Sequence, residues 1–314
     1  MAGATEPSPP SESSAPSVQP RFDEFAVPAG DRPHDVAPAP DGRVWYTAQR
    51  AGMLGALDPE TGDVQRVALG EGSAPHGVIM GPDDAPWVTD GGLNAIARVD
   101  PETLEVTTLP LPVTENASLN TAAFDGDGVL WFTGQRGVYG RVDPADGEVE
   151  VFDAPRGAGP YGIAATPDGT VWLASLAGSY IGRIDADGGL TVVDVPTPGG
   201  GARRIWSDSQ GNPWVTEWNA GKLARYDPAA GAWQEWPLPG DSSQPYAVFV
   251  DDEDIVWVTD FGADALVRFD PRTEQMSAFP FPTSGAEVRQ LLGRSGEVWG
   301  AGSATDTILV LRTR

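Results

Sequence analysis

The sequence predicts an all-β protein, a seven-bladed β-propeller with four short strands in each blade. The first observation is a repeat: seven tryptophans recur at intervals of 41 to 44 residues, which is the period of a propeller blade. The second is the composition, because 39 Gly and 30 Pro in 314 residues interrupt the chain too often for long helices. The repeated tryptophans are Trp45, Trp87, Trp131, Trp172, Trp214, Trp257 and Trp299.

Each repeat contains the same elements in the same order. It begins with a turn-like pair such as Pro33-His34, and a short alternating apolar run then predicts the first strand. A polar turn leads into the second strand, which contains the tryptophan. The third strand ends at an Asp-Pro turn such as Asp58-Pro59, and the fourth runs into a crossover rich in Pro and Gly. Packing between blades accounts for the repeated Trp, Val and Ile.

The seventh repeat lacks a fourth strand, because the chain ends soon after its third, at residues 308–311. An alternating segment at the other end of the chain, residues 22–27, supplies the missing strand. We therefore predict that the N-terminal strand closes the last blade and removes both open sheet edges. This gives one propeller domain over residues 21–314. Residues 1–20 are rich in Pro, Ser and Ala and are expected to form a disordered leader, not a signal peptide.

The charge and composition exclude several classes of partner. The formal net charge is −25 and the pI is near 4.2, so nucleic acid and anionic membrane surfaces are not expected to bind. No apolar run approaches the roughly 18 residues that span a bilayer. The absence of cysteine excludes disulfides, thiolate metal sites and a cysteine nucleophile. We expect a cytoplasmic monomer without an organic cofactor.

The repeat also shows which residues share one end of the ring. With the first residue of each Pro-His-type pair as position 0, position 1 precedes the first strand and position 15 follows the second. One hairpin separates them, so both are expected at the same end, facing the central funnel. Position 1 is occupied by His34, His76, Asn120, Tyr161, Arg203, Tyr246 and Val288. Position 15 is occupied by Ala48, Asp90, Gly134, Ser175, Glu217, Asp260 and Gly302.

This diversity is typical of a site built on a repeating scaffold. Both histidines of the chain lie at position 1, so we predict catalytic roles for His34 and His76, assisted by Tyr246 and by Arg203. The predicted ligands of a divalent cation, Mg²⁺ or Ca²⁺, are Asp90, Glu217 and Asp260. The predicted contacts of a small molecule in the funnel are Asn120, Tyr161, Trp218 and Phe261. The alternative to a functional role is that the Pro-His pairs only reflect the residues preferred in a turn.

Several segments resemble one known family. They are PYGIAATPDGTVWLAS at residues 160–175, PHGVIMGPDDAPWVTD at residues 75–90, WVTEW at residues 214–218 and LAR at residues 223–225. In these segments the chain resembles the streptogramin B lyases (virginiamycin B lyases), over about residues 22–314. The resemblance implies opening of a cyclic depsipeptide by elimination: a histidine removes a proton α to a carbonyl while Mg²⁺ acts as Lewis acid.

The resemblance also places the family's functional residues. The family has histidines at position 1 of the last two repeats and a metal-binding glutamate at position 15 of the last. In this chain those positions hold Tyr246, Val288 and Gly302. A similar set, displaced by two blades around the ring, consists of His34, His76 and Asp90.

Functions from different classes fit these patterns. One is a lyase or hydrolase that acts on a small cyclic ester or lactone in the funnel. Another is a non-catalytic propeller that binds a small molecule, sugar or peptide through the aromatic residues of the rim. A calcium-dependent lactonase is a third, with Glu217, Asn120 and Asp260 as the nearest ligands. A scaffold for protein partners is the fourth.

Overall fold

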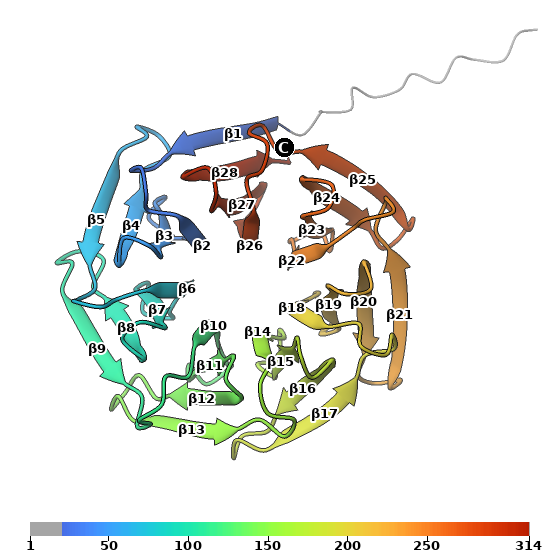
Figure 1. The fold of residues 1–314 in the computed structure, drawn as a ribbon, viewed down its shortest axis with the longest axis horizontal. Coiled ribbons are helices and arrows are strands. Elements are labelled where there is room, and N and C mark those ends of the chain that lie inside the picture. Colours follow the sequence, from blue (N-terminus) through green and yellow to red (C-terminus); the bar gives the residue numbers. More distant parts are fainter. Residues whose placement is uncertain (1–20, 314) are drawn as a thin grey trace, which may run out of the picture.

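The tryptophan repeats form the blades of a ring. The computed structural model describes residues 21–313, in which seven four-stranded antiparallel sheets surround a central axis (Figure 1). The prediction of an all-β, seven-bladed propeller is therefore confirmed. Residues 21–313 include no helix that is long and apolar enough to cross a membrane. The predicted leader, residues 1–20, lies outside the described residues.

The two inner strands of each blade form the hairpin on which the site is built. The innermost strands are β2 (Pro33–Pro38), β6 (Pro75–Met80), β10 (Leu119–Phe124), β14 (Pro160–Ala165), β18 (Ala202–Ser207), β22 (Pro245–Val250) and β26 (Val288–Arg294). The tryptophan strands are β3 (Val44–Ala48), β7 (Pro86–Asp90), β11 (Leu130–Gly134), β15 (Val171–Ser175), β19 (Pro213–Glu217), β23 (Val256–Asp260) and β27 (Glu297–Gly302).

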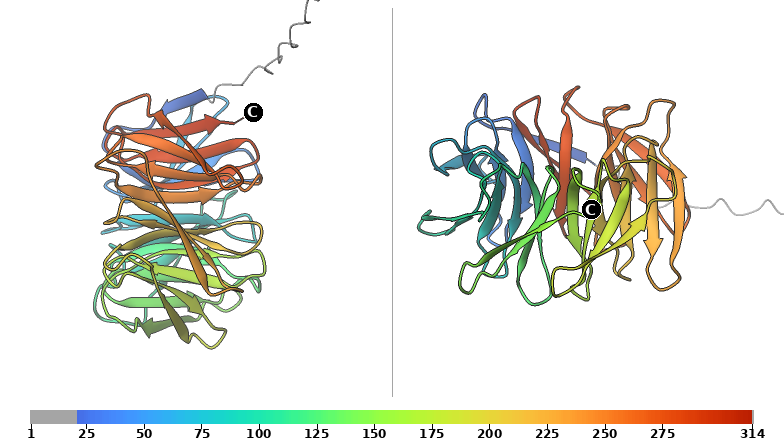
Figure 2. Two further views of the ribbon diagram at one scale, coloured as in Figure 1. Left: turned by 90° about the vertical axis from the view of Figure 1, so that its right-hand side faces the viewer. Right: turned by 60° about the horizontal axis from the view of Figure 1, so that its bottom comes forward.

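Two further strands complete each blade toward the outside. The third strands are β4 (Met53–Leu57), β8 (Ala95–Val99), β12 (Val138–Val142), β16 (Tyr180–Ile184), β20 (Lys222–Asp227), β24 (Ala265–Asp270) and β28 (Thr307–Arg312). The outermost strands are β5 (Val64–Ala68), β9 (Val106–Pro110), β13 (Val149–Asp153), β17 (Leu190–Asp194), β21 (Ala232–Pro237), β25 (Gln275–Pro280) and β1 (Arg21–Ala26). Blades are numbered 1–7, beginning with β2. The ring is flattened, with connecting loops at both ends (Figure 2).

The N-terminal strand closes the last blade, as predicted. β1 pairs antiparallel with β28, from Arg21 opposite Arg312 to Ala26 opposite Thr307, and the blade has the order β1-β28-β27-β26. Arg312 adds an ion pair to Asp23 of β1 at 2.9 Å. Because β28 is covered by a strand from the opposite end of the chain, the ring has no unpaired seam between its first and last blades.

The hydrophobic core lies between neighbouring blades. Tyr46 and Trp299, for example, are fully buried in one cluster that joins blades 1 and 7. The indole N–H of a blade tryptophan often donates to the acidic residue of the turn before its strand, as Trp131 does to Asp125 at 2.8 Å. A buried indole N–H needs such an acceptor, so the repeated turn carboxylates have a structural role.

Candidate functional site

A β-bulge at the start of each innermost strand places positions 1 and 2 beside the axis. In blade 1, Pro33 pairs with Ala48 but Val36 pairs with Tyr46, so β2 contains one extra residue between them. The same register shift occurs in the six other blades. Bulges re-aim the side chains around them, so two consecutive residues approach the funnel instead of pointing to opposite faces.

In five of the seven blades, a threonine two residues after the tryptophan stabilises the bulge. The Thr47 hydroxyl accepts the Asp35 backbone N–H at 3.0 Å and donates to the His76 carbonyl of the next blade at 2.8 Å. The equivalent bonds to the next blade are Thr89 to Asn120 (2.5 Å), Thr133 to Tyr161 (2.5 Å) and Thr216 to Tyr246 (2.8 Å). Each hydroxyl therefore fixes position 1 of the following blade against its own strand.

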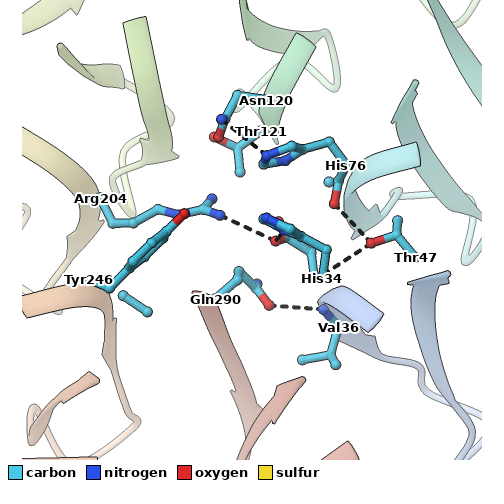
Figure 3. A network of polar contacts seen from close by, with 12 residues as sticks. His34, Val36, Thr47, His76, Asn120, Thr121, Arg204, Tyr246 and Gln290 are labelled. Carbon is cyan, nitrogen blue, oxygen red and sulfur yellow. Dashed lines mark hydrogen bonds and ion pairs between the residues drawn. The ribbon is translucent and has the colours of Figure 1, made fainter. Parts of the chain in front are cut away.

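His34 and Asp35 form a buried pair next to the axis. His34 Nδ1 lies 2.7 Å from Asp35 Oδ1, and because a carboxylate only accepts, the nitrogen donates. Arg204 reaches across the funnel from blade 5, and its Nη2 donates to the same oxygen at 3.2 Å. Figure 3 shows Arg204 pointing toward His34, with Gln290 holding the Val36 backbone N–H at 2.9 Å. Neighbouring and opposite blades thus position the His-Asp pair.

His76 packs on His34 and completes the histidine pair. The two ring centroids are 3.9 Å apart. The side-chain nitrogen of Asn120 lies 3.3 Å from His76 Nε2 and donates to it, so the ring proton is on Nδ1 (Figure 3). That Nδ1 is buried without a partner in the described residues. His34 Nε2, in contrast, is neither hydrogen-bonded within residues 21–313 nor fully enclosed.

The surroundings keep both imidazoles neutral. Burial, then the charges of Arg204, Arg289 and Arg203, lower the pKa of His34 well below its ordinary value. Burial and the neighbouring His34 lower the pKa of His76 in the same way. Burial raises the pKa of Asp35, but Arg204 opposes this rise. A neutral His34 whose Nδ1 donates to Asp35 has its lone pair on Nε2, which makes it a proton acceptor.

An arginine-aromatic cluster occupies another sector of the funnel. The Arg203 guanidinium lies 3.6 Å from the Tyr246 ring centroid and 4.2 Å from that of Trp218. Phe261 stacks on Tyr246 at 4.8 Å, and the Tyr161 and Tyr246 hydroxyls are 2.5 Å apart. These aromatic faces are therefore in contact with the protein's own arginine and with one another.

The two tyrosines differ in acidity. Burial opposes ionisation of Tyr161, but Arg203 and Arg204 more than offset it and lower the pKa of Tyr161. Burial and the adjacent Tyr161 raise the pKa of Tyr246 to about 12. The hydroxyl pair is therefore polarised, with Tyr161 as the more acidic member.

The carboxylates at position 15 bind loop backbone. Asp90 Oδ1 accepts from the backbone N–H of Ala74, Gly92 and Leu93 at 2.9 to 3.0 Å, and Oδ2 accepts from the Ser73 hydroxyl. Asp260 Oδ1 likewise accepts from two backbone N–H groups, at 2.7 and 2.9 Å, while its Oδ2 is buried without a partner. These contacts anchor the loops beside β6 and β22, and they do not join Asp90 to His76.

Glu217 lies in a separate acidic group next to β21. Burial and then contact with Glu235 raise the pKa of Glu217 to about 7. Both side-chain oxygens of Glu217 are buried without a hydrogen-bond partner in the described residues. Lys222 pairs with Glu235 at 3.2 Å. Glu217 is therefore engaged away from the two histidines.

Two cavities lie next to the His34–Asp35 pair, and one of them is large enough for a ligand. A pocket of about 530 Å³ between blades 1 and 7 is lined by Arg32, His34, Gln49, Arg50, Arg289 and Ser303. Deeper on the axis, the space beyond Asp35 and Arg204 is only about 30 Å³, room for a water molecule or two. The outer pocket is of ligand size, and His34 lies on its wall.

The axial residues do not fit the divalent cation that the sequence predicts. Among the described residues, one group of three histidine or carboxylate ligand atoms lies within 4.8 Å: His34, Asp35 and His76. Asp35 is already paired with Arg204, and the arginine charges that lower the pKa of His34 also repel a cation. Mg²⁺ and Ca²⁺ prefer several oxygen ligands, which this group does not offer.

Asp35 and Arg204 are absent from the predicted site, although position 2 contains a signal for them. Small or uncharged residues occupy that position in five blades: Gly77, Thr121, Gly162, Ala247 and Gln290. Charged residues occupy it in two: Asp35 and Arg204. In blade 7, Val288 pairs with Gly302 as Pro33 pairs with Ala48 in blade 1, so the assignment of Val288 to position 1 is wrong: Arg289 is at position 1 and Gln290 at position 2. A charge where the repeat otherwise has a small residue marks a special environment. Regular strand alternation would place the side chain at position 2 on the face opposite to position 1. Only the bulge brings it to the funnel, so the sequence pattern alone does not assign this residue to the site.

The fold and this geometry define a class: a seven-bladed propeller with a polar site where its innermost strands converge. The virginiamycin B lyase family model matches residues 14–230, and the chain belongs to that family. No curated protein matches the chain in sequence.

Solved structures agree on the fold. The virginiamycin B lyase of Staphylococcus aureus is 22% identical with a TM-score of 0.87, over 94% of this chain and 99% of that one. A streptogramin B lyase structure is 24% identical with the same TM-score, over 95% and 100% of the two chains. A catalytically inactive S. aureus variant with quinupristin is 22% identical, with a TM-score of 0.87, over 94% and 99%.

Proposed function

We propose that the chain is a ring-opening enzyme that acts on a small cyclic ester or lactone, with His34 as the general base. The observation that supports this most is the His34–Asp35 pair, at 2.7 Å, on the wall of a ligand-sized pocket. Asp35 fixes the imidazole with its lone pair on Nε2 and stabilises the imidazolium that forms when Nε2 takes a proton. The family relationship supports the same reaction class.

Two ring-opening reactions are open to such a base. In elimination, Nε2 takes a proton from carbon, the C–H electron pair forms a C=C bond, and the ester C–O bond breaks toward the carboxylate oxygen. In hydrolysis, Nε2 takes a proton from water as the water oxygen adds to the ester carbonyl; the acyl C–O bond then breaks, and the leaving alcohol oxygen takes the proton back from the imidazolium. We favour elimination because the relatives in the family are lyases. The two products differ by the mass of one water, so mass spectrometry separates them.

The test compares His34→Gln and Asp35→Asn with the unmodified protein on a panel of streptogramin B depsipeptides and small lactones. We expect His34→Gln to reduce kcat/KM by about 100-fold or more, and Asp35→Asn by a smaller factor. Asp143→Asn, the same chemical change in an outer turn, is the matched control and should leave kcat/KM unchanged. A panel without any turnover, or a His34→Gln variant as active as the unmodified protein, would contradict the proposal.

A binding propeller without catalysis is the second candidate. It is favoured by an open hollow of about 500 Å³ beside the aromatic cluster, lined by Trp218, Asn219, Ser242, Ser243, Gln244 and Gly262. A ligand that stacks on the exposed part of Trp218 would change the tryptophan fluorescence. In this case binding would be lost in Trp218→Ala and kept in His34→Gln.

A further inference from the structure

The pocket between blades 1 and 7 has a charge opposite to that of the molecule. The chain contains 45 Asp and Glu against 20 Lys and Arg. Of the six residues that line this pocket, three are arginines (Arg32, Arg50 and Arg289) and none is acidic. A strongly acidic surface with a cationic pocket focuses the potential at one place, which attracts small anions.

The arginines of this region have unused hydrogen-bond donors. Arg32 and Arg50 are exposed, and neither has a carboxylate partner in the described residues. Arg289 pairs with Glu287 through Nη2 at 2.6 Å, but its Nε is buried without an acceptor. The Nε atoms of Arg203 and Arg204, farther along the funnel wall, are also buried without acceptors. Buried N–H groups are nearly always satisfied, so these donors point to a bound acceptor.

We infer that this pocket is an anion subsite, in which Arg32, Arg50 and Arg289 bind a carboxylate of the ligand next to His34. Guanidinium groups suit this role because they bind carboxylate oxygens through two parallel N–H donors. The ligand is a small molecule, because the net charge of −25 on the whole chain repels a long polyanion. The inference rests on the proposed function in placing this carboxylate beside the general base.

The reaction itself supplies such a group. When His34 Nε2 takes the proton and the ester C–O bond breaks, the electron pair of that bond moves to the oxygen of the leaving carboxylate. One negative charge therefore appears on the substrate as one positive charge appears on the imidazole. Arginines that already face this position stabilise the developing anion without rearrangement.

The test measures anion binding without turnover. Succinate and inorganic phosphate are titrated separately into the full chain by calorimetry, at an ionic strength held constant with NaCl. The chain has two histidines, so ¹⁵N-histidine NMR reports directly whether the anion reaches His34. We expect saturable succinate binding with one site and a shift of the His34 resonances, because a nearby anion changes the field at the ring.

Two double variants locate the site. Arg32→Gln with Arg50→Gln removes two exposed charges from the pocket and should weaken succinate binding about tenfold or more. Arg183→Gln with Arg272→Gln removes the same charge from other parts of the surface and should leave the affinity unchanged. Both sets of residues are exposed, so both proteins are expected to fold, which circular dichroism verifies.

Absence of saturable succinate binding would overturn the inference, as would equal weakening in the two double variants or binding of phosphate alone. Its failure is distinct from that of the proposed function. If turnover depends on His34 but no anion binds, the anion subsite is ruled out and the proposed enzymatic function stands. If anion binding depends on Arg32 and Arg50 but no cyclic ester is turned over, the anion subsite stands and the proposed enzymatic function is ruled out.

Discussion

The Asp35 carboxylate determines which ring nitrogen of His34 carries the proton. Without this carboxylate, either ring nitrogen of His34 could carry the proton. With Oδ1 at 2.7 Å from Nδ1, the lone pair stays on Nε2. Arg204 holds this carboxylate from the opposite side of the funnel at 3.2 Å, so we expect replacement of Arg204 to change the position of the proposed base, His34, through Asp35.

The histidines give a pH-dependent stability with a definite sign. Their pKa values are lowered in the folded protein, while the unfolded chain takes up protons near 6.5. The unfolded state therefore binds more protons below pH 6.5, so the free energy of unfolding should fall as the pH decreases from 6.5 toward 5.5. Urea titrations at several pH values measure this, and His34→Gln should flatten the curve. Histidine NMR resonances that titrate near pH 6.5 in the folded protein would contradict the prediction.

At this scale the sequence was informative where the repeat is regular. Position 1 brings His34, His76 and Asn120 together as its shared place in the repeat implies. The same argument from the repeat places Asp90, at position 15, at this end of the ring. Its side chain does not join the histidines, because its oxygens accept loop N–H groups. Which polar group a carboxylate meets depends on the conformation of the crossover loops, and no periodic pattern specifies that conformation.

At the scale of elements, β1 shows how one strand completes both a sheet and a ring. Its position was predictable because the seventh repeat lacks a strand and residues 22–27 have the alternation of one. The bulges of the innermost strands were not predictable, because their sequences resemble ordinary strands. In five of the seven blades a threonine hydroxyl of the neighbouring strand, such as that of Thr47, accepts a backbone N–H that the ladder leaves unpaired, whereas blades 4 and 7 have the same bulge with alanine at this position.

Phe25 tests how much the closing strand contributes. Its ring stacks on Trp299 with centroids 6.0 Å apart, and it pairs with Ile308 of β28. Because Phe25 is only partly buried, we expect Phe25→Ala to lower the free energy of unfolding by about 2 kcal/mol, less than a fully buried phenylalanine. Arg21→Ala, in the same strand but with a side chain 84% exposed, is the control and should change it by less than about 0.5 kcal/mol. Equal effects in urea unfolding would show that β1 is not anchored through its apolar face.

At the scale of the whole molecule, the net charge of −25 opposes the compact state. Salt screens this repulsion, so we expect Tm to rise with NaCl concentration between about 10 mM and 0.5 M. Calorimetric scans measure the change, with sucrose as an uncharged control for general exclusion effects. A Tm that falls over this range would mean that ion pairs such as Arg312 with Asp23 outweigh the overall repulsion.

The threonine bonds between blades are unevenly distributed around the ring. Blades 4 and 7 have Ala174 and Ala301 at the threonine position, so the first strands of blades 5 and 1 receive no such bond. Blade 1 is held instead by Ser303, whose hydroxyl donates to the Pro33 carbonyl at 2.6 Å. Blade 5 contributes Arg204, whose ion pair with Asp35 of blade 1 crosses the hollow centre. The ion pair between Arg204 and Asp35 therefore joins two blades whose first strands lack a threonine bond, in addition to fixing the carboxylate next to His34.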